Sequence, residues 1–231
     1  MQNMMAPPNG ADEFEPASSS QHLRVAGWLR DRIIEGEFLP GAKIPEVATC
    51  DRLGISRTPL REAFKVLAAE RILTLQPNRG AIVTPVGLDD IEQAMTVTAT
   101  LEGLAGELLC DHVTSAEVDR LSILTKELTL HRRAGDLMAY FKVNQEIHRL
   151  IIEGSRNRTL IETHEMLSNR FARYRFVGNK SPDRWDRAML EHELILGAIR
   201  DRDSAVIGPL LKSHILNGWR VARGKSFDTT D

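Results

Sequence analysis

The apolar positions in the first third of the chain predict three helices followed by a β-hairpin. Three stretches place apolar residues three or four positions apart, which is the period of an amphipathic helix: residues 21–36, 45–53 and 56–70. Gly36, Gly54 and the turn Leu39-Pro40-Gly41 separate these stretches. Two β-rich runs, residues 72–75 and 81–84, flank a loop that contains Asn and Gly, and they predict the hairpin.

Beyond Pro85-Val86-Gly87 the pattern is helical throughout. Six helices are expected, over residues 88–110, 115–132, 135–153, 157–176, 184–201 and 203–222. The loops between them are short, which favours an antiparallel bundle. The predicted fold is therefore mainly α, with a flexible tail at residues 1–20, a small domain at 21–86 and an all-helical domain at 87–231.

Charge and composition narrow the class of protein. The 231 residues carry a formal net charge of -2, yet residues 21–86 hold 10 Lys and Arg against 7 Asp and Glu, so the positive excess lies in the small domain. The longest apolar run, residues 194–199, is far too short to cross a membrane, and the acidic start does not resemble a secretion signal. Two cysteines cannot form a disulfide framework. We expect a cytoplasmic protein with no membrane partner.

The third predicted helix carries a basic stripe. Three cationic residues lie four positions apart on the face opposite its apolar residues: Arg57, Arg61 and Lys65. A short helix before it and a hairpin after it give the order of a winged helix-turn-helix, whose basic face enters the major groove of DNA. The hydroxyls of Ser56 and Thr58 suit a phosphate oxygen, and Arg79 and Gly80 could reach the minor groove. The alternative is an ordinary solvated helix face.

These residues resemble the GntR family of bacterial transcription regulators. The resemblance is carried by three strings: residues 38–41 (Phe-Leu-Pro-Gly), 53–63 (Leu-Gly-Ile-Ser-Arg-Thr-Pro-Leu-Arg-Glu-Ala) and 78–83 (Asn-Arg-Gly-Ala-Ile-Val). It implies a winged helix domain that binds a double-stranded DNA operator as a homodimer. By position, Arg57 and Arg61 match the arginines that contact bases and phosphates, and Gly80 matches the glycine at the wing tip.

A second set of polar residues lies in the helical domain. Asn144 and His148 are four positions apart on one predicted helix, and His192 and His214 lie on two later helices among apolar neighbours. Three imidazoles and one oxygen from different helices can surround a divalent metal inside a bundle. Histidines packed in the core without a metal remain the alternative. The other histidines are expected at the surface or at helix ends: His22, His112, His131 and His164.

From about Asp89 onward the chain is similar to the FCD ligand-binding domain found in one GntR subfamily. The matching strings are residues 135–136, 144–148, 155–157, 191–192 and 213–215. In the metal-binding branch these positions supply one Asp or Asn and three His. The resemblance therefore implies a metal bound by Asn144, His148, His192 and His214, with zinc as the first candidate and nickel or manganese as others. A small organic acid then acts as the effector.

Two departures from that branch bear on the effector. Asn144 replaces the usual Asp, so three neutral imidazoles and a neutral amide would leave the charge of the metal uncompensated, which favours an anionic effector. Thr98 stands where many members carry an arginine. We therefore expect Arg170, Arg173 or the metal itself to meet the effector carboxylate. The alternative for each arginine is a solvated or interhelical salt-bridge role, which is the more common one for isolated helix arginines.

The leading hypothesis is a dimeric transcription regulator, a repressor, whose operator binding responds to a small organic acid held at a metal. One alternative is a DNA-binding regulator whose helical domain is metal-free and serves only dimerisation. Another is a metalloenzyme with a three-histidine centre, although no HExxH string, nucleophile elbow or phosphate-binding loop is present.

Overall fold

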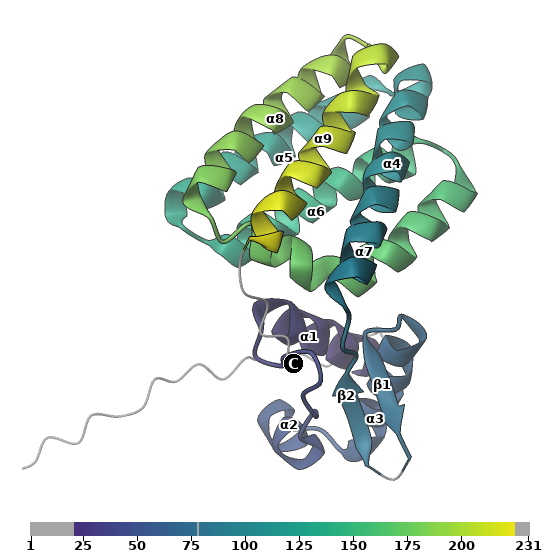
Figure 1. Ribbon diagram of the computed structural model, residues 1–231, viewed down its shortest axis with the longest axis vertical. Coiled ribbons are helices and arrows are strands. Elements are labelled where there is room, and N and C mark those ends of the chain that lie inside the picture. The colour runs from purple at the N-terminus through teal and green to yellow at the C-terminus, as the bar shows by residue number, and fades with distance from the viewer. Residues whose placement is uncertain (1–20, 78, 225–231) are drawn as a thin grey trace, which may run out of the picture.

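The computed structural model describes residues 21–77 and 79–224. The predicted flexible tail, residues 1–20, and Asn78 in the predicted wing loop lie outside the described residues. Figure 1 shows two parts joined by the chain between β2 and α4, a small lower part and an upper bundle of helices. The mainly helical fold with a short two-stranded wing confirms the predicted fold class.

The elements follow the predicted order. The small part contains α1 (Gln21–Glu35), α2 (Glu46–Leu53), α3 (Arg57–Ala69), β1 (Leu73–Gln76) and β2 (Gly80–Val83). The bundle contains α4 (Leu88–His112), α5 (Ser115–Ala134), α6 (Leu137–Gly154), α7 (Arg158–Gly178), α8 (Pro182–Arg200) and α9 (Ser204–Arg223). None of the helices in the described part of the chain is long and apolar enough to cross a membrane.

Capping residues set where the bundle helices begin. Thr114 and Glu117 form a reciprocal capping box at the start of α5. Asp136, Asn157 and Asp203 each accept a backbone N–H at the start of α6, α7 and α9. Because these caps fix the first turn of each helix, they also fix which side chains face the interior.

The wing is an antiparallel hairpin in which Leu73 pairs with Val83 and Gln76 pairs with Gly80. Lys43 adds an isolated bridge to Ile82, which ties the wing to the turn before α2. The inward residues of the hairpin join a hydrophobic core built from α1, α2 and α3. This core lies wholly within residues 25–83, and the main core of the bundle lies within residues 105–211.

Glycines allow α4 and α9 to pack closely. A Cβ on Gly103 would lie 3.0 Å from the carbonyl oxygen of Gly208, and a Cβ on Gly106 would lie 2.4 Å from the Leu211 side chain. Only glycine permits the two backbones to approach so nearly. The buried residues of α4 therefore face the interior of the bundle along most of the helix.

A small contact joins the two parts. Ile34 of α1 packs with Phe141, Ala172 and Phe176 of α6 and α7. The guanidinium of Arg173 donates to the carbonyl oxygens of Ile33 and Ile34 at 3.2 and 3.3 Å, where α1 ends. A cation at this position interacts favourably with the negative end of the helix dipole. Helix α7 thus holds α1 through both apolar and charged contacts.

Gly36 and Arg173 should be coupled energetically. Gly36 has φ +95°, and a Cβ there would lie 2.6 Å from Arg173 Nη1. Gly36→Ala should lower the free energy of unfolding by ~1–2 kcal/mol from backbone strain and should also displace the guanidinium. In the Gly36→Ala variant, Arg173→Ala should then lower the free energy of unfolding by ~0.5 kcal/mol less than it does in the wild type. A double-mutant cycle in urea measures this difference.

Gly135→Ala is the matched control for this cycle. Gly135 also has positive φ, +70°, but nothing lies within 4 Å of a Cβ built there. Its effect should add to that of Arg173→Ala without coupling. Strict additivity of Gly36→Ala and Arg173→Ala would show that the guanidinium does not depend on the open space at Gly36.

Candidate nucleic-acid interface and metal centre

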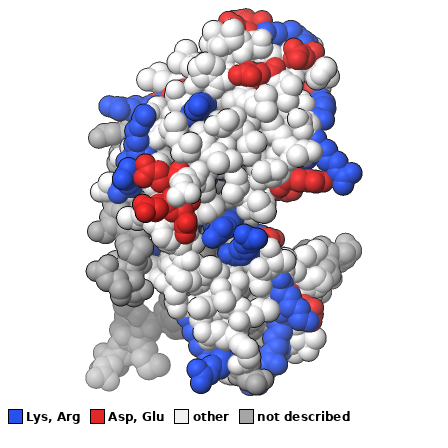
Figure 2. Space-filling model, turned by 45° about the vertical axis from the view of Figure 1, so that its right-hand side comes forward, with Lys and Arg blue, Asp and Glu red and all other residues white. Residues whose placement is uncertain are grey.

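The basic stripe of α3 lies on the surface of the small part. Arg57, Arg61 and Lys65 are exposed, whereas the apolar residues of the other face of α3 are buried. Figure 2 shows Lys and Arg side chains gathered on the lower part of the molecule with few acids beside them in that view. A surface groove of about 680 Å³ is bordered by α2, α3 and the wing, and its lining includes Arg57, Arg61 and Arg79. The residues predicted to contact DNA therefore share one face.

Ser56 and Thr58 flank Arg57 where α3 begins, and Gly80 lines a second groove together with Arg61 and Lys65. Ser56 caps α3 with extended backbone and makes no side-chain cap bond, and both Ser56 and Thr58 are exposed. Their hydroxyls are thus available to a phosphate at the positive end of α3. Gly80 begins β2 with φ +85°, a conformation that favours glycine.

Acidic residues partly neutralise this face. Arg61 Nε donates to Glu46 Oε2 at 3.2 Å, and Lys65 Nζ donates to Glu62 Oε1 at 2.7 Å. A Cβ on Gly80 would lie 2.7 Å from Glu46 Oε1, so the wing backbone lies directly against that carboxylate. Glu46 was not foreseen as a partner of Arg61, because the two residues are on different helices.

The three predicted histidine ligands meet inside the bundle. One ring nitrogen from each of His148, His192 and His214 can be chosen so that all three lie within 4.8 Å of one another. The rings of His192 and His214 have centroids 4.7 Å apart, and all three side chains are buried. Helices α6, α8 and α9 each contribute one of them.

The predicted oxygen ligand lies with them. Asn144, one turn before His148 on α6, accepts a hydrogen bond from His192 Nε2 through Oδ1 at 2.7 Å. His148 Nε2 and His192 Nδ1 are buried and have no hydrogen-bond partner among the residues that the structure describes. Buried nitrogens without partners are costly, so a cation that accepts their lone pairs would remove that cost. The donor set of three imidazoles and one amide oxygen suits zinc or another first-row divalent metal.

Two carboxylates orient two of the histidines by accepting hydrogen bonds from their Nδ1 atoms. Glu102 Oε2 accepts from His148 Nδ1 at 2.5 Å, and Glu191 Oε2 accepts from His214 Nδ1 at 2.6 Å. A carboxylate on Nδ1 fixes the tautomer and turns Nε2 toward the other histidines, an arrangement typical of metal-binding histidines. Both carboxylates come from positions distant in sequence from the histidine that each holds.

The electrostatics of the site keep two imidazoles neutral. Burial, together with the neighbouring His214 and His148, lowers the pKa of His192 well below its usual range. Burial also lowers the pKa of His214, to about 4, although Glu191 opposes the shift. Neutral imidazole is the form that binds a metal.

The two carboxylates remain ionised. Burial alone would raise the pKa of Glu102, but His148, His164 and Arg175 hold it well below its usual range. Burial would likewise raise the pKa of Glu191, but His214 and Arg184 lower it to about 2. The buried Glu102 and the partly buried Glu191 are thus compensated by their neighbours.

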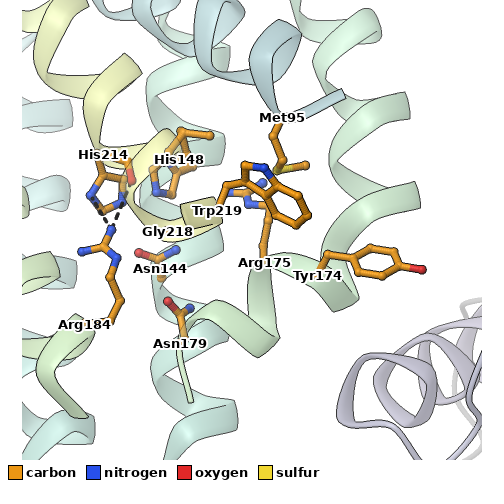
Figure 3. Close-up of a pocket in the computed structure, with 11 residues that line it drawn as sticks. Met95, Asn144, His148, Tyr174, Arg175, Asn179, Arg184, His214, Gly218 and Trp219 are labelled. Atoms are coloured by element: carbon orange, nitrogen blue, oxygen red, sulfur yellow. Dashed lines mark hydrogen bonds between the residues drawn. The ribbon is translucent and has the colours of Figure 1, made fainter. Parts of the chain in front are cut away.

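A cavity of about 30 Å³ adjoins this centre. Its lining includes Asn144, His148 and His214. Arg184 lies beside His214, and Arg175 lies on the other side of Asn144 (Figure 3). The volume is enough for an ion or a few water-sized groups in this conformation.

The two arginines predicted for the effector are not among the described residues that line this cavity. Arg173 bonds to the end of α1, and the guanidinium of Arg170 lies 5.0 Å from the ring centroid of Phe171, so neither lines the cavity. Arg175 and Arg184 take their place as candidates. The reason is helical phase: Phe171, Tyr174 and Arg175 share the buried face of α7, whereas Arg173 points toward α1.

His164 was expected at the surface, and that expectation is wrong. It is buried, and its Nε2 donates to Glu102 Oε1 at 3.1 Å. Glu102 was also missed as a functional residue. Its signal in the sequence was its place on the apolar face of α4, in line with Met95, Thr98 and Leu109. A lone acid on such a face requires a buried partner.

Removing the Glu102 carboxylate should destabilise the bundle strongly. Glu102 is 0% exposed, and Glu102→Ala would leave the buried Arg175 without its neighbouring carboxylate. We expect a loss of ~3–5 kcal/mol in the free energy of unfolding, measured by urea denaturation. Glu62→Ala, which breaks only the exposed pair with Lys65, is the control and should cost less than ~0.5 kcal/mol. Equal losses for the two variants would contradict the role given to Glu102.

Comparison with known proteins supports both parts of this picture. The chain is 26% identical over 200 residues to the uncharacterized HTH-type transcriptional regulator YdhC of Bacillus subtilis, covering 84% of this chain and 86% of that protein. It is 28% identical over 183 residues to the Nta operon transcriptional regulator of Aminobacter aminovorans, covering 77% and 83%. Among solved structures, E. coli McbR/YncC superposes with a TM-score of 0.80 at 22% identity, covering 90% of this chain and 99% of that chain.

Two family descriptions match the chain in succession. The one described as "Bacterial regulatory proteins, gntR family" matches residues 21–83, and the one described as "FCD domain" matches residues 93–217. The first spans the basic face, and the second spans the three histidines. The chain therefore belongs to the GntR family, with an FCD domain after its DNA-binding part, and it is a transcriptional regulator rather than an enzyme.

Proposed function

We propose that this chain is a homodimeric repressor whose affinity for its operator is changed by a small organic acid bound at a divalent metal in the FCD domain. The observation that carries the proposal is the buried group of three histidines, two of which have a ring nitrogen without a partner. Residues 21–86 would form the DNA-binding domain and residues 87–231 the effector-binding and dimerisation domain.

The metal would be held by Asn144, His148, His192 and His214. When bound, it would supply a Lewis acid to an anionic oxygen of the effector. Zinc fits the imidazole-rich set first, and nickel or manganese are the other candidates. Glu102 and Glu191 would keep two of the histidines in the metal-binding tautomer.

The operator would be contacted by the exposed face of α3 and by the wing. Arg57 and Arg61 would read base edges and contact phosphates in the major groove, and Lys65 would add a phosphate contact. The Ser56 and Thr58 hydroxyls would bind phosphate where α3 begins. Arg79 and Gly80 would place the wing in the adjacent minor groove.

Two observations support a homodimer that acts as a repressor. Val97 and Leu104, seven residues apart on α4, are 48% and 42% exposed, which leaves an apolar stripe for a second copy. A relative named as a probable D-xylose utilization operon transcriptional repressor, from Paenarthrobacter nicotinovorans, is 30% identical over 149 residues, or 62% of this chain.

Helix α7 would transmit the effector signal. Arg175 lies at the cavity, and Arg173, two residues earlier, bonds to the end of α1. A shift of α7 on effector binding would move α1 and thereby change the spacing of the two recognition helices. Such coupling is typically ~1–3 kcal/mol between sites.

Metal analysis decides between this proposal and a metal-free domain used only for dimerisation. Protein purified without a histidine tag should retain about one divalent ion per chain, measured by inductively coupled plasma mass spectrometry. His148→Ala should lower metal affinity at least ~10-fold, because it removes the nitrogen that Glu102 orients. His164→Gln is the matched control: it changes a buried histidine on the same carboxylate but outside the group of three, and it should keep the metal.

A wild-type protein that binds no metal under these conditions would favour the dimerisation-only alternative. Loss of metal in His164→Gln to the same degree as in His148→Ala would also count against the proposed ligand set.

DNA binding should depend on the α3 arginines. The Arg57→Ala/Arg61→Ala variant should bind a duplex selected by the wild-type protein at least ~30-fold more weakly, since each arginine is worth ~1–3 kcal/mol in base contacts. Fluorescence anisotropy at fixed salt measures the change. Arg158→Ala removes a 91% exposed arginine at the start of α7 and should change affinity less than twofold. Unchanged affinity in the double variant would exclude α3 as the reading helix.

A further inference from the structure

Val47 places an apolar side chain on the outer surface of α2. It is 57% exposed, more than the other exposed large apolar residues in the described part of the small domain, Leu23 at 50% and Leu75 at 46%. A single exposed apolar residue is common on protein surfaces and does not by itself indicate a function. Val47 differs from such residues in what surrounds it.

The packing of α2 holds Val47 toward solvent. Helix α2 buries Thr49, Cys50 and Leu53, and the last two belong to the core of the small part. Val47 and Asp51, one turn apart, lie on the opposite face and are exposed. A rotation of α2 that buried Val47 would expose the residues that now fill the core. The direction of the Val47 side chain is therefore set by the fold of the small part.

Val47 faces the groove bordered by α2, α3 and the wing. The lining of this groove includes Val47 together with Arg57, Arg61 and Arg79. Figure 1 shows α2 and the wing at the lower end of the small part, away from the bundle. Val47 thus lies among the arginines proposed to bind the operator.

The charges beside Val47 favour a base edge over a phosphate at this place. Glu46 and Asp51 flank Val47 on α2, and their carboxylates repel a phosphate. Glu46 also accepts from Arg61 Nε at 3.2 Å, which ties the start of α2 to the reading helix. The cations that attract the DNA backbone come from other elements, including Arg57 on α3 and Arg79 in the wing. The part of the duplex left to Val47 is the floor of the major groove.

The chemistry of that floor indicates which base suits a valine. Among the four bases, thymine alone carries an apolar group on its major-groove edge, the C5-methyl. A valine that packs on this methyl removes apolar surface of both partners from water. A base that presents only polar atoms there would instead have them desolvated by a side chain that cannot bond to them.

We propose that Val47 packs against the C5-methyl group of a thymine in the major groove and so specifies one thymine in each half-site of the operator. This inference rests on the proposed position of α3 in the same groove. It adds a base that none of the arginines would read, because arginine is suited to guanine and to phosphate.

The test is a thymine-to-uracil scan of a duplex that the full-length wild-type protein selects from random sequences. Uracil pairs with adenine as thymine does and lacks only the C5-methyl group. We expect one thymine in each half-site at which this replacement weakens wild-type binding at least ~3-fold, measured by fluorescence anisotropy at fixed salt. Val47→Ala should bind the thymine duplex at least ~3-fold more weakly than the wild type does. It should also bind the thymine and uracil duplexes equally at that position.

Leu23→Ala is the matched control. It shortens an exposed apolar residue of α1 that is outside the lining of both grooves beside α3, and it should keep the full preference for thymine. Thermal melting followed by circular dichroism checks that Val47→Ala is folded, which we expect because Val47 is exposed.

A wild-type protein that is indifferent to every uracil replacement overturns the inference, as does a Val47→Ala variant that keeps the preference for thymine. Either result, together with loss of binding in Arg57→Ala/Arg61→Ala, leaves the proposed role of α3 intact. If Val47→Ala loses the preference but the double arginine variant keeps full affinity, the contact of Val47 stands and the role of α3 is wrong. A wild-type protein that selects no sequence contradicts both.

Discussion

The buried carboxylate of Glu102 is the interaction on which the interior of the FCD domain depends. It lies on α4 with no exposed surface and joins His148 of α6 to His164 and Arg175 of α7. An ionised carboxylate in such a place is tolerable only because several donors surround it. Since those donors include a candidate metal ligand and a cavity arginine, one side chain sets the positions of both. The close approach of α4 and α9 through glycines brings the helix that carries Glu102 deep enough to make these contacts.

Helix α7 connects this interior to the DNA-binding part. Its buried face carries His164 and Arg175, and its other side carries Arg173, whose guanidinium holds the end of α1. In the part of the chain that the structure describes, the other contacts between the parts include an apolar cluster around Ile34 and an ion pair between Lys142 and Asp31. A small interface is easily repositioned, because few contacts have to change. A ligand that displaces α7 even slightly would therefore alter the orientation of α1, whereas the larger cores of the two parts would stay as they are.

The sequence predicted the helices well because each is bounded by a strong local signal. Gly54 and Gly135 end helices with positive φ, and Asp136, Asn157 and Asp203 begin them with side-chain caps. The observed boundaries lie within two residues of the predicted ones. The two-residue shifts include the end of α4, at His112, and the start of α8, at Pro182 in its first turn. Local signals of this kind need no knowledge of the tertiary structure.

The site was harder to predict, because its partners lie far apart in the chain. The i, i+4 spacing relates Asn144 to His148, but nothing local relates Glu102 to His148, 46 residues away. The same limit explains why Arg173 rather than Arg175 was named for the effector. The two arginines lie on different sides of α7, and the sequence does not show which side faces the cavity and which faces α1. Periodicity predicted the helix over residues 88–110. It could not show that a glutamate of this helix would find three partners on other helices.

The basic residues on the exposed face of α3 are partly neutralised by acids, and this affects how strongly the face attracts DNA of any sequence. Arg61 is paired with Glu46 and Lys65 with Glu62, so two of the three cations of the stripe are partly neutralised before DNA arrives. Contact with phosphate must exchange these internal pairs, which lowers the sequence-independent part of the affinity. In the proposed homodimer, specific binding would then depend more on base contacts and on having two recognition helices at the right spacing. Such a protein would be sensitive to small changes in domain orientation, and the hydrogen bonds of Arg173 to Ile33 and Ile34 are among the contacts that join α1 to the FCD domain.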